Sequence, residues 1–432
     1  MALFSKWVNL LGSENAFKIG PKIKSIEDQG KKVIKCNLGE PDFPVPQFIK
    51  DEVKRQIDLD NTHYCDPQGI LSLRQAVANH FHRTRGVEAD PRRVVVFPGG
   101  KPPIGMSQMA YCSPGDEVIY PSPGYPIYES FVASVGARPV PIHLSEESGF
   151  TLSGAEVEAA ITRRTRLVFL NFPSNPTGGV ASKEQLGEIA EVILRKGSKD
   201  LRVYADEVYE HILFDGSRHE SISSFPGMAE RTIIVGGASK SFSWTGGRLG
   251  WAMFPTLAEA EMFRNLAINF YSCCPAYNQE GARLGLESPL FAAANRQMIE
   301  AFQARRDLVV EGLRKIEGIR CQMPKGAFYV FPNVEGACER LGILDAYRRL
   351  PADVRALTTP STLLQMFLLF EYQVATMDRK SFGRIGTEKL HYLRLSIATD
   401  IDSLRLAVSR IADAAKDAAG FERFLRKGEN LS

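Results

Sequence analysis

The 432-residue sequence lacks the features that mark membrane, disulfide-linked and zinc-binding proteins. No apolar run approaches the roughly 18 residues that a membrane helix needs, and the N-terminus has no secretory apolar segment. The seven cysteines are odd in number and include no C-x-x-C pair, which argues against a disulfide framework and against a structural zinc site. Reduced cysteines are typical of the cytoplasm. We therefore expect a cytoplasmic protein that holds no metal and does not associate with a membrane.

An excess of charge of one sign is also missing. The 53 Lys and Arg residues nearly balance the 50 Asp and Glu residues, for a net charge of +3, and no basic stripe suited to nucleic acid is present. The sequence contains neither a P-loop nor a G-x-G-x-x-G fingerprint, so the ordinary nucleotide-binding interpretations fail. These absences favour a globular protein with small-molecule substrates.

Short β-branched runs recur between about residue 45 and residue 300, and helical periods such as 183–195 separate several of them. The expected strands are 94–97, 118–120, 167–170, 203–205 and 232–235. Continuous apolar strands that alternate with helices predict an α/β fold, with a mostly parallel sheet flanked by helices. Such sheets bind ligands beyond the carboxyl ends of their strands.

The pattern changes after residue 300 and predicts a smaller α+β domain. The expected helices are 298–315 and 363–370, and the expected strands are 329–331, 374–376 and 392–397. The last strand alternates with period two, which places Leu393, Leu395 and Ile397 toward a core and Tyr392, Arg394 and Ser396 on the other face.

The N-terminal residues read as a separate arm. Phe4, Trp7, Val8 and Leu11 fall at helical spacing, which predicts a short amphipathic arm that packs on this chain or on a partner. We therefore divide the chain into an arm with part of the small domain (1–47), a large domain (48–300) and a small C-terminal domain (301–432).

Two polar residues follow expected strands closely enough to carry chemistry. Lys240 lies in a tight turn of Gly, Ala and Ser after strand 232–235, where desolvation frees a lysine amine to attack an aldehyde; a loop lysine is more often simply solvated. Asp206 ends strand 203–205. Beside a pyridine ring its carboxylate would keep the ring nitrogen protonated, although a helix cap explains a strand-end aspartate equally well.

Three further segments could recognise polar ligands. Asn175 is fixed by two neighbouring prolines, and the guanidinium of Arg248 could pair with a phosphate. The turn Gly99-Gly100-Lys101 precedes an expected helix with proline at its start, and backbone N–H groups at such a position bind phosphate. Each segment alone is also compatible with a plain turn or a surface residue.

Together these segments resemble the fold-type I enzymes that use pyridoxal 5′-phosphate (PLP), specifically the class I/II aminotransferases around aspartate aminotransferase. The likeness runs from residues 37–43 to Arg394, with six segments in the family's order and spacing. It implies a PLP-dependent exchange of an amino group between an L-amino acid and a 2-oxo acid by a ping-pong mechanism. It also implies a large PLP-binding domain and a smaller α+β domain.

The resemblance implies a role for each matching residue. Lys240 would hold the cofactor as a Schiff base and move a proton at the substrate α-carbon, Asp206 would pair with the ring nitrogen, and Tyr209 would contact the ring's phenolic oxygen. The other implied cofactor-binding residues are Tyr64, Gly99, Gly100, Lys101, Tyr125 (stacked on the ring), Asn175, Ser239 and Arg248. The implied substrate-binding residues are Gly39, Lys101, Asn175 and Arg394, the last of which would clamp the α-carboxylate. Tyr64 would reach the site of the neighbouring subunit, which implies a homodimer.

Departures from the family pattern affect the phosphate and the substrate side chain. Gly237 stands where many relatives carry a phosphate-binding serine, so Ser239 or a water must serve, and Gly247 replaces a common aromatic residue. Residues 336–390 match poorly. Lys101 matches a lysine that binds the distal carboxylate in an aspartate-using subgroup, which makes aspartate or another acidic amino acid a candidate donor.

Other functions share parts of this pattern. A C–S lyase or an amino-acid oxidase could use the same fold and cofactor with small changes around the ring. A PLP-sensing regulator would carry a DNA-binding winged helix, for which the residues before about 30 leave no room. Transamination is the function that the residues favour.

Overall fold

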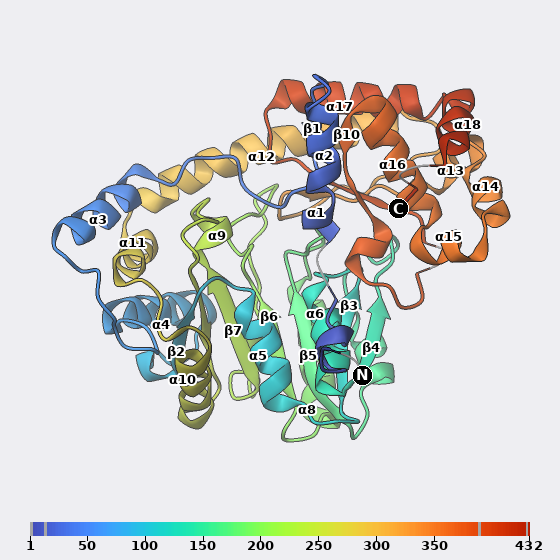
Figure 1. The fold of residues 1–432 in the computed structure, drawn as a ribbon. Coiled ribbons are helices and arrows are strands. Elements are labelled where there is room, and N and C mark those ends of the chain that lie inside the picture. Colours follow the sequence, from blue (N-terminus) through green and yellow to red (C-terminus); the bar gives the residue numbers. More distant parts are fainter. Residues whose placement is uncertain (1–2, 13–14, 388–389, 429–430) are drawn as a thin grey trace.

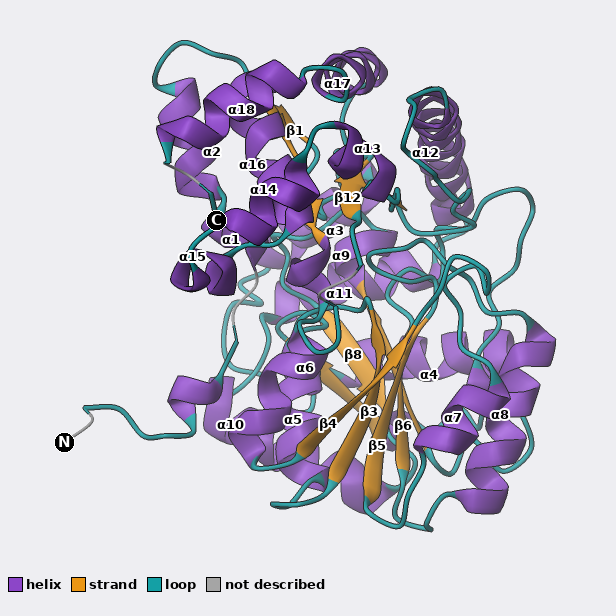
Figure 2. Ribbon diagram, turned by 90° about the vertical axis from the view of Figure 1, so that its right-hand side faces the viewer, coloured by secondary structure: helices purple, strands orange, loops and turns teal. Residues whose placement is uncertain are grey.

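The computed structural model describes residues 3–12, 15–387, 390–428 and 431–432. At its centre is a seven-stranded sheet of order β2-β8-β7-β6-β5-β3-β4 (Figures 1 and 2). Its strands are β2 (Val94–Phe97), β3 (Glu117–Ser122), β4 (Arg138–His143), β5 (Thr165–Asn171), β6 (Arg202–Asp206), β7 (Thr232–Gly237) and β8 (Gly250–Met253). The strand β8 pairs antiparallel with β2 and β7, and the other pairs are parallel. The predicted mostly parallel sheet is confirmed.

Helices cover both faces of this sheet because its strands are apolar on both sides. Along β5, Leu167 and Phe169 pack in one cluster, whereas Val168 and Leu170 pack in the cluster on the opposite face. The helices of this part are α3 (Gln47–Asp58), α4 (Leu71–Arg85), α5 (Pro102–Tyr111), α6 (Ile127–Val132), α7 (Gly154–Ala160), α8 (Lys183–Lys196), α9 (Ala238–Ser241), α10 (Leu257–Tyr271) and α11 (Ala276–Glu287).

A second group of elements packs above the carboxyl ends of the large sheet (Figure 1). Its strands are β1 (Ile34–Lys35), β9 (Tyr329–Val330), β10 (Val374–Ala375), β11 (Met377–Asp378) and β12 (Leu393–Ser396), arranged as a parallel pair β1-β10 and a sheet β11-β12-β9. Its helices are α1 (Asn15–Lys18), α2 (Gly20–Glu27), α12 (Leu290–Arg314), α13 (Glu335–Arg340), α14 (Ile343–Arg349), α15 (Ala352–Leu357), α16 (Pro360–Tyr372), α17 (Ile401–Ala414) and α18 (Ala418–Lys427). The β1-β10 pair joins the N-terminal residues to the C-terminal part of the chain.

The helical spacing of the N-terminal arm does not give an α-helix within residues 3–12. Only a 3-10 turn, Val8–Leu10, forms there, and the four apolar residues at helical spacing are 39–63% exposed. A short helix gains its stability from packing its apolar face, and these side chains pack little within the described chain. The helix expected from residue 298 begins eight residues earlier, at Leu290. Within the described residues, none of the helices is long and apolar enough to cross a membrane.

Candidate active site

A cavity of about 410 Å³ opens where the carboxyl ends of β5, β6 and β7 face β9 and β12. Most residues expected to bind cofactor or substrate line it: Gly39, Gly100, Lys101, Tyr125, Asn175, Asp206, Tyr209, Ser239, Lys240, Arg248 and Arg394. Two expected residues do not: Gly99 lies just behind Gly100, and Tyr64 is 90% exposed outside the cavity.

Asp206 is held rigidly at the end of β6, and one of its oxygens has no partner. Asn171, its register partner on β5, donates from Nδ2 to the Asp206 backbone oxygen at 3.0 Å. The Tyr128 hydroxyl donates to Oδ2 at 2.6 Å, whereas the buried Oδ1 accepts no hydrogen bond from any described residue. Burial raises the pKa of Asp206 to about 6. The carboxylate is therefore a pre-oriented acceptor whose buried Oδ1 can take a donor from a molecule in the cavity.

Lys240 enters the cavity from α9, the single helical turn that follows β7. The backbone stays tied to the sheet because Ala238 N–H donates to the Leu249 carbonyl at 3.1 Å. The Lys240 amine donates to the Gly39 carbonyl and lies 6.0 Å from the centre of the Tyr209 ring. The amine, Tyr209 and Asp206 thus converge on one space.

The Arg248 guanidinium lies at the end of the cavity where β2 leads into α5. It donates to the Thr245 carbonyl at 2.8 Å and to the Pro98 carbonyl at 3.2 Å. Gly99 has φ +99°, and a Cβ there would lie 2.6 Å from an Arg248 terminal nitrogen. Glycine is therefore required for the close approach of this turn to the guanidinium. Next to it, Gly100 and the N-cap residue Lys101 line the cavity just before α5. Because α5 begins with Pro102 and Pro103, which have no N–H, the backbone donors that this turn offers a phosphate are those of Gly100 and Lys101.

The second arginine, Arg394, lies on β12 at the other side of the cavity. Its Nη1 donates to Asn175 Oδ1 at 3.0 Å, Nη2 donates to the Asn37 carbonyl at 2.5 Å, and its guanidinium carbon is 4.5 Å from the centre of the Tyr329 ring. Leu393, Leu395 and Ile397 are buried in the core as expected, but Tyr392, Arg394 and Ser396 are buried as well, so β12 shows no alternation of burial. The Arg394 side chain lines the cavity.

Three contributors were not anticipated: Tyr128, Asn171 and Tyr329. Tyr128 lies on α6, three residues after Tyr125, and the two rings meet edge to face with their centres 5.8 Å apart. Asn171 ends β5 as Asp206 ends β6, and the rule that identified Asp206 applies to it equally. Tyr329 hydrogen-bonds to Tyr209 (O···O 2.8 Å), a long-range contact with no local signal.

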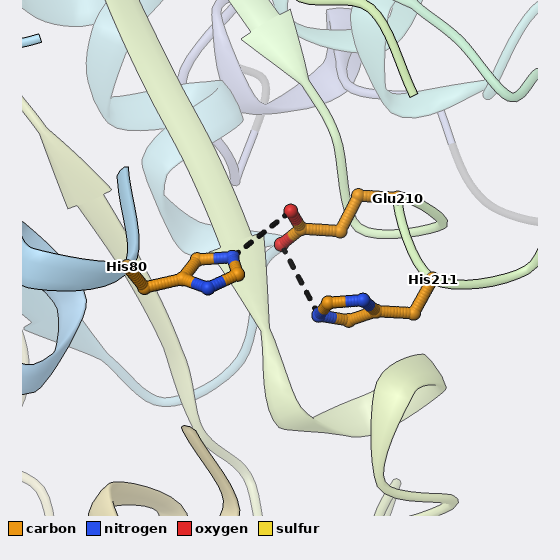
Figure 3. Close-up of side chains that lie close together, drawn as sticks. All are labelled: His80, Glu210 and His211. Atoms are coloured by element: carbon orange, nitrogen blue, oxygen red, sulfur yellow. Dashed lines mark hydrogen bonds and ion pairs between the residues drawn. The ribbon is translucent and has the colours of Figure 1, made fainter. Parts of the chain in front are cut away.

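Behind the cavity lies a buried polar cluster of His80, Glu210 and His211, whose potential metal-ligating atoms are within 4.8 Å of one another (Figure 3). Arg85 donates to the same Glu210 carboxylate at 2.7 Å and to Glu207 at 2.8 Å. Burial alone would raise the pKa of Glu210, but the charges of Arg85 and His80 hold it well below its usual value. A guanidinium so close opposes a divalent cation, so the cluster is better described as an ion network.

Comparisons with known proteins agree with this geometry. The family described as Aminotransferase class I and II matches residues 31–411. The chain is 34% identical to an aspartate aminotransferase of Rhizobium meliloti (strain 1021), covering 94% of this chain and 95% of the relative. It is also 34% identical to aromatic-amino-acid aminotransferase 2 of Thermococcus litoralis, covering 89% and 92%.

Solved structures give the same result for the fold. The crystal structure of the aspartate aminotransferase from Rhizobium meliloti superposes with a TM-score of 0.84 at 32% identity, covering 96% of this chain and 99% of that one. A maleate complex of the Thermus thermophilus aspartate aminotransferase gives 0.83 at 30% identity, covering 96% and 100%. The chain therefore belongs to the class I and II aminotransferase family and is an aminotransferase of the aspartate aminotransferase type.

Proposed function

We propose that the cavity binds PLP and that the enzyme transfers an amino group from an L-amino acid to a 2-oxo acid in two half-reactions at this one site. The family generally uses this cofactor. The observation that carries the proposal is the buried Asp206 Oδ1, which accepts no hydrogen bond from the described residues. A protonated pyridine nitrogen is the donor that fits it, and an unfilled acceptor of this kind is costly without a ligand.

The remaining groups around the cavity fit the other parts of PLP. Arg248 and the turn of Gly99, Gly100 and Lys101 suit the phosphate, with Ser239 beside them. Tyr125 suits a ring-stacking role, and Tyr209 and Asn175 suit the phenolic oxygen. When bound, PLP supplies an electron sink for the bond that breaks at the substrate α-carbon.

The side chains of this protein then orient the substrate and move its proton. The Arg394 fork binds the α-carboxylate in two parallel hydrogen bonds, which fixes how the substrate lies in the cavity. In this orientation the Cα–H bond would face Lys240, whose Nζ would take the α-proton of the amino acid in the first half-reaction and supply a proton to the α-carbon of the second substrate in the other. Asp206 in its ionised form keeps the ring nitrogen protonated.

An acidic amino acid such as aspartate is the substrate that we propose. Arg394 is assigned to the α-carboxylate and Arg248 to the phosphate, which leaves Lys101 as a cation for a distal carboxylate. The Lys101 amine lies 5.9 Å from the centre of the Tyr125 ring, at the cavity wall. Relatives bear the names aspartate aminotransferase and aspartate/prephenate aminotransferase.

We further propose a homodimer in which Tyr64 completes the site of the neighbouring subunit. Its 90% exposure in the single chain is consistent with a side chain that serves another subunit. The proposed division of the chain remains 1–47, 48–300 and 301–432, with the cavity between the last two parts.

The test combines cofactor mapping with donor screening. Borohydride reduction of the PLP-loaded protein and peptide mapping should find a pyridoxyl group on Lys240, and aspartate should convert the bound cofactor to its pyridoxamine form. Lys240→Ala should bind PLP only non-covalently and lose turnover. An unmodified Lys240 would refute the site, whereas pyruvate and ammonia released from a cysteine conjugate, or oxygen consumption, would indicate a lyase or an oxidase.

A further inference from the structure

A fully buried arginine, Arg379, lies in the small domain and is not among the residues that line the cavity. Arg379 begins the 3-10 turn Arg379–Phe382 between β11 and β12 and is 1% exposed. Its Nη2 donates to Ser122 Oγ at 2.9 Å, and Nη1 donates to the Gly383 and Phe382 carbonyls at 3.2 and 3.4 Å. It forms no ion pair with the described residues, and its Nε has no hydrogen-bond partner among them.

Such a residue is costly for stability. A buried charge is normally paired with an opposite charge, and even a complete buried ion pair adds little to stability relative to apolar residues of similar size. Burial lowers the pKa of Arg379 to about 10, so the guanidinium is still charged at neutral pH. Stability alone therefore does not explain an arginine here.

The bonds of Arg379 join the loop before β12 to the turn that carries Tyr125. Ser122 ends β3, three residues before Tyr125. The same turn is tied to the loop by Gly124 N–H, which donates to the Phe382 carbonyl at 2.9 Å. Further along, Arg384 N–H donates to the Glu129 carboxylate at 3.2 Å. The Arg379 guanidinium is the buried side chain that bonds to both the loop before β12 and the turn that carries Tyr125.

The same loop supports the proposed carboxylate-binding arginine. The Phe382 ring is buried, and its centre lies 4.9 Å from the Arg394 guanidinium carbon. At this distance the ring makes a cation–π contact with the guanidinium. Because Arg379 bonds to the Phe382 carbonyl, it fixes the backbone from which that ring projects. The Arg379 guanidinium thus bonds both to the turn that carries Tyr125 and to the backbone of Phe382, whose ring contacts Arg394.

We propose that Arg379 is a positioning residue, which holds the Tyr125 turn and the Phe382 ring in place and thereby sets the orientation of Arg394 toward substrate carboxylates. This inference rests on the proposed function, because it assigns Arg394 to the α-carboxylate. Both half-reactions use that carboxylate, so the KM values for the amino donor and for the 2-oxo acid depend on Arg379 together.

The first test is Arg379→Met in the PLP-loaded enzyme. Misplacement of a binding group by about 1 Å costs on the order of 10²-fold, so kcat/KM should fall about 10- to 100-fold for both substrates, mainly through KM. The melting temperature should change little, because removal of the buried charge offsets the loss of its hydrogen bonds to Ser122, Phe382 and Gly383. Arg379→Lys should recover only part of the loss, since one nitrogen cannot reach Ser122 and both carbonyls.

Two further variants keep the test decisive if Arg379→Met does not fold. Ser122→Ala removes the acceptor of Nη2 and should raise both KM values by several-fold, with no additional effect in the Arg379→Met background. Lys380→Met is the matched control: this neighbouring cation donates to the Ala356 carbonyl, and its removal should leave both KM values unchanged.

Three outcomes would overturn the inference. They are unchanged KM values in Arg379→Met, unchanged KM values in Ser122→Ala, or a loss of activity that follows a lowered melting temperature and disappears on cooling. A wild-type enzyme that does not transaminate would instead refute the proposed function, so the two failures are distinguishable.

Discussion

The segment from Asp206 to His211 has two sides, and both bury acidic groups. Toward the cavity, Asp206 Oδ1 has no hydrogen-bond partner among the described residues. Away from it, Glu207 and Glu210 are bound by Arg85, and Glu207 also by His219 at 3.2 Å. The degree of burial is similar on the two sides: Asp206, Glu207 and Glu210 are 4–7% exposed.

The pKa shifts on the two sides run in opposite directions. Burial raises the pKa of Asp206 to about 6, whereas the charges of Arg85 and the histidines outweigh burial and lower the pKa values of Glu207 and Glu210. The partner, rather than burial, therefore decides the sign. An acid left unsatisfied beside a cavity points to ligand binding, and an acid satisfied within the core points to structural support.

Asp206→Asn should give the largest effect and should act on activity alone. The neutral amide cannot keep a pyridine nitrogen protonated, so we expect kcat/KM to fall by about 10³-fold. The raised pKa of Asp206 stabilises the folded protein below about pH 4, and this contribution is lost as pH rises to about 6. Removing the charge should thus leave the melting temperature at pH 7.5 equal or higher. A large drop in melting temperature would contradict the assignment of this side to catalysis.

Arg85→Met should show the reverse pattern. It leaves Glu207 and Glu210 buried without their cation, which costs about 3–5 kcal/mol of unfolding free energy, measurable by urea denaturation. The folded fraction should keep kcat/KM within a few-fold of wild type. Arg83→Met, an exposed cation on the same helix α4, is the control and should change neither. A catalytic defect in Arg85→Met without loss of stability would contradict the assignment of Glu207 and Glu210 to structural support.

The sequence identified the sheet and most of the cavity because both depend on local patterns. Apolar runs followed by polar residues at strand ends were sufficient for Lys240 and Asp206, and β2 begins and ends as expected. The resemblance then supplied Arg248 and Arg394, whose local context alone was ambiguous.

What the sequence did not supply depends on contacts between distant segments. Arg379 bonds to Ser122 across 257 positions and Tyr329 meets Tyr209 across 120, so no local pattern marks either pair. The N-terminal arm shows the opposite case, in which a local pattern is present but the contacts are missing. The helical spacing from Phe4 to Leu11 is present, but these side chains stay largely exposed, and periodicity without burial does not form a stable helix.

Tyr128→Phe gives the smallest expected change and is the most direct probe of how the cavity side is tuned. The hydrogen bond from Tyr128 lowers the pKa of Asp206 against the effect of burial, and losing a hydrogen bond to a charged group costs about 1.5 kcal/mol, or about one pH unit. The wild-type apoenzyme should lose affinity for PLP below about pH 6, and in Tyr128→Phe the loss should begin about one unit higher. Tyr111→Phe, whose hydroxyl donates to Glu259 instead, should behave as wild type. If both proteins lose PLP affinity at the same pH, Tyr128 does not set the charge of Asp206, and the Val208 backbone N–H together with Lys240 must oppose the effect of burial instead.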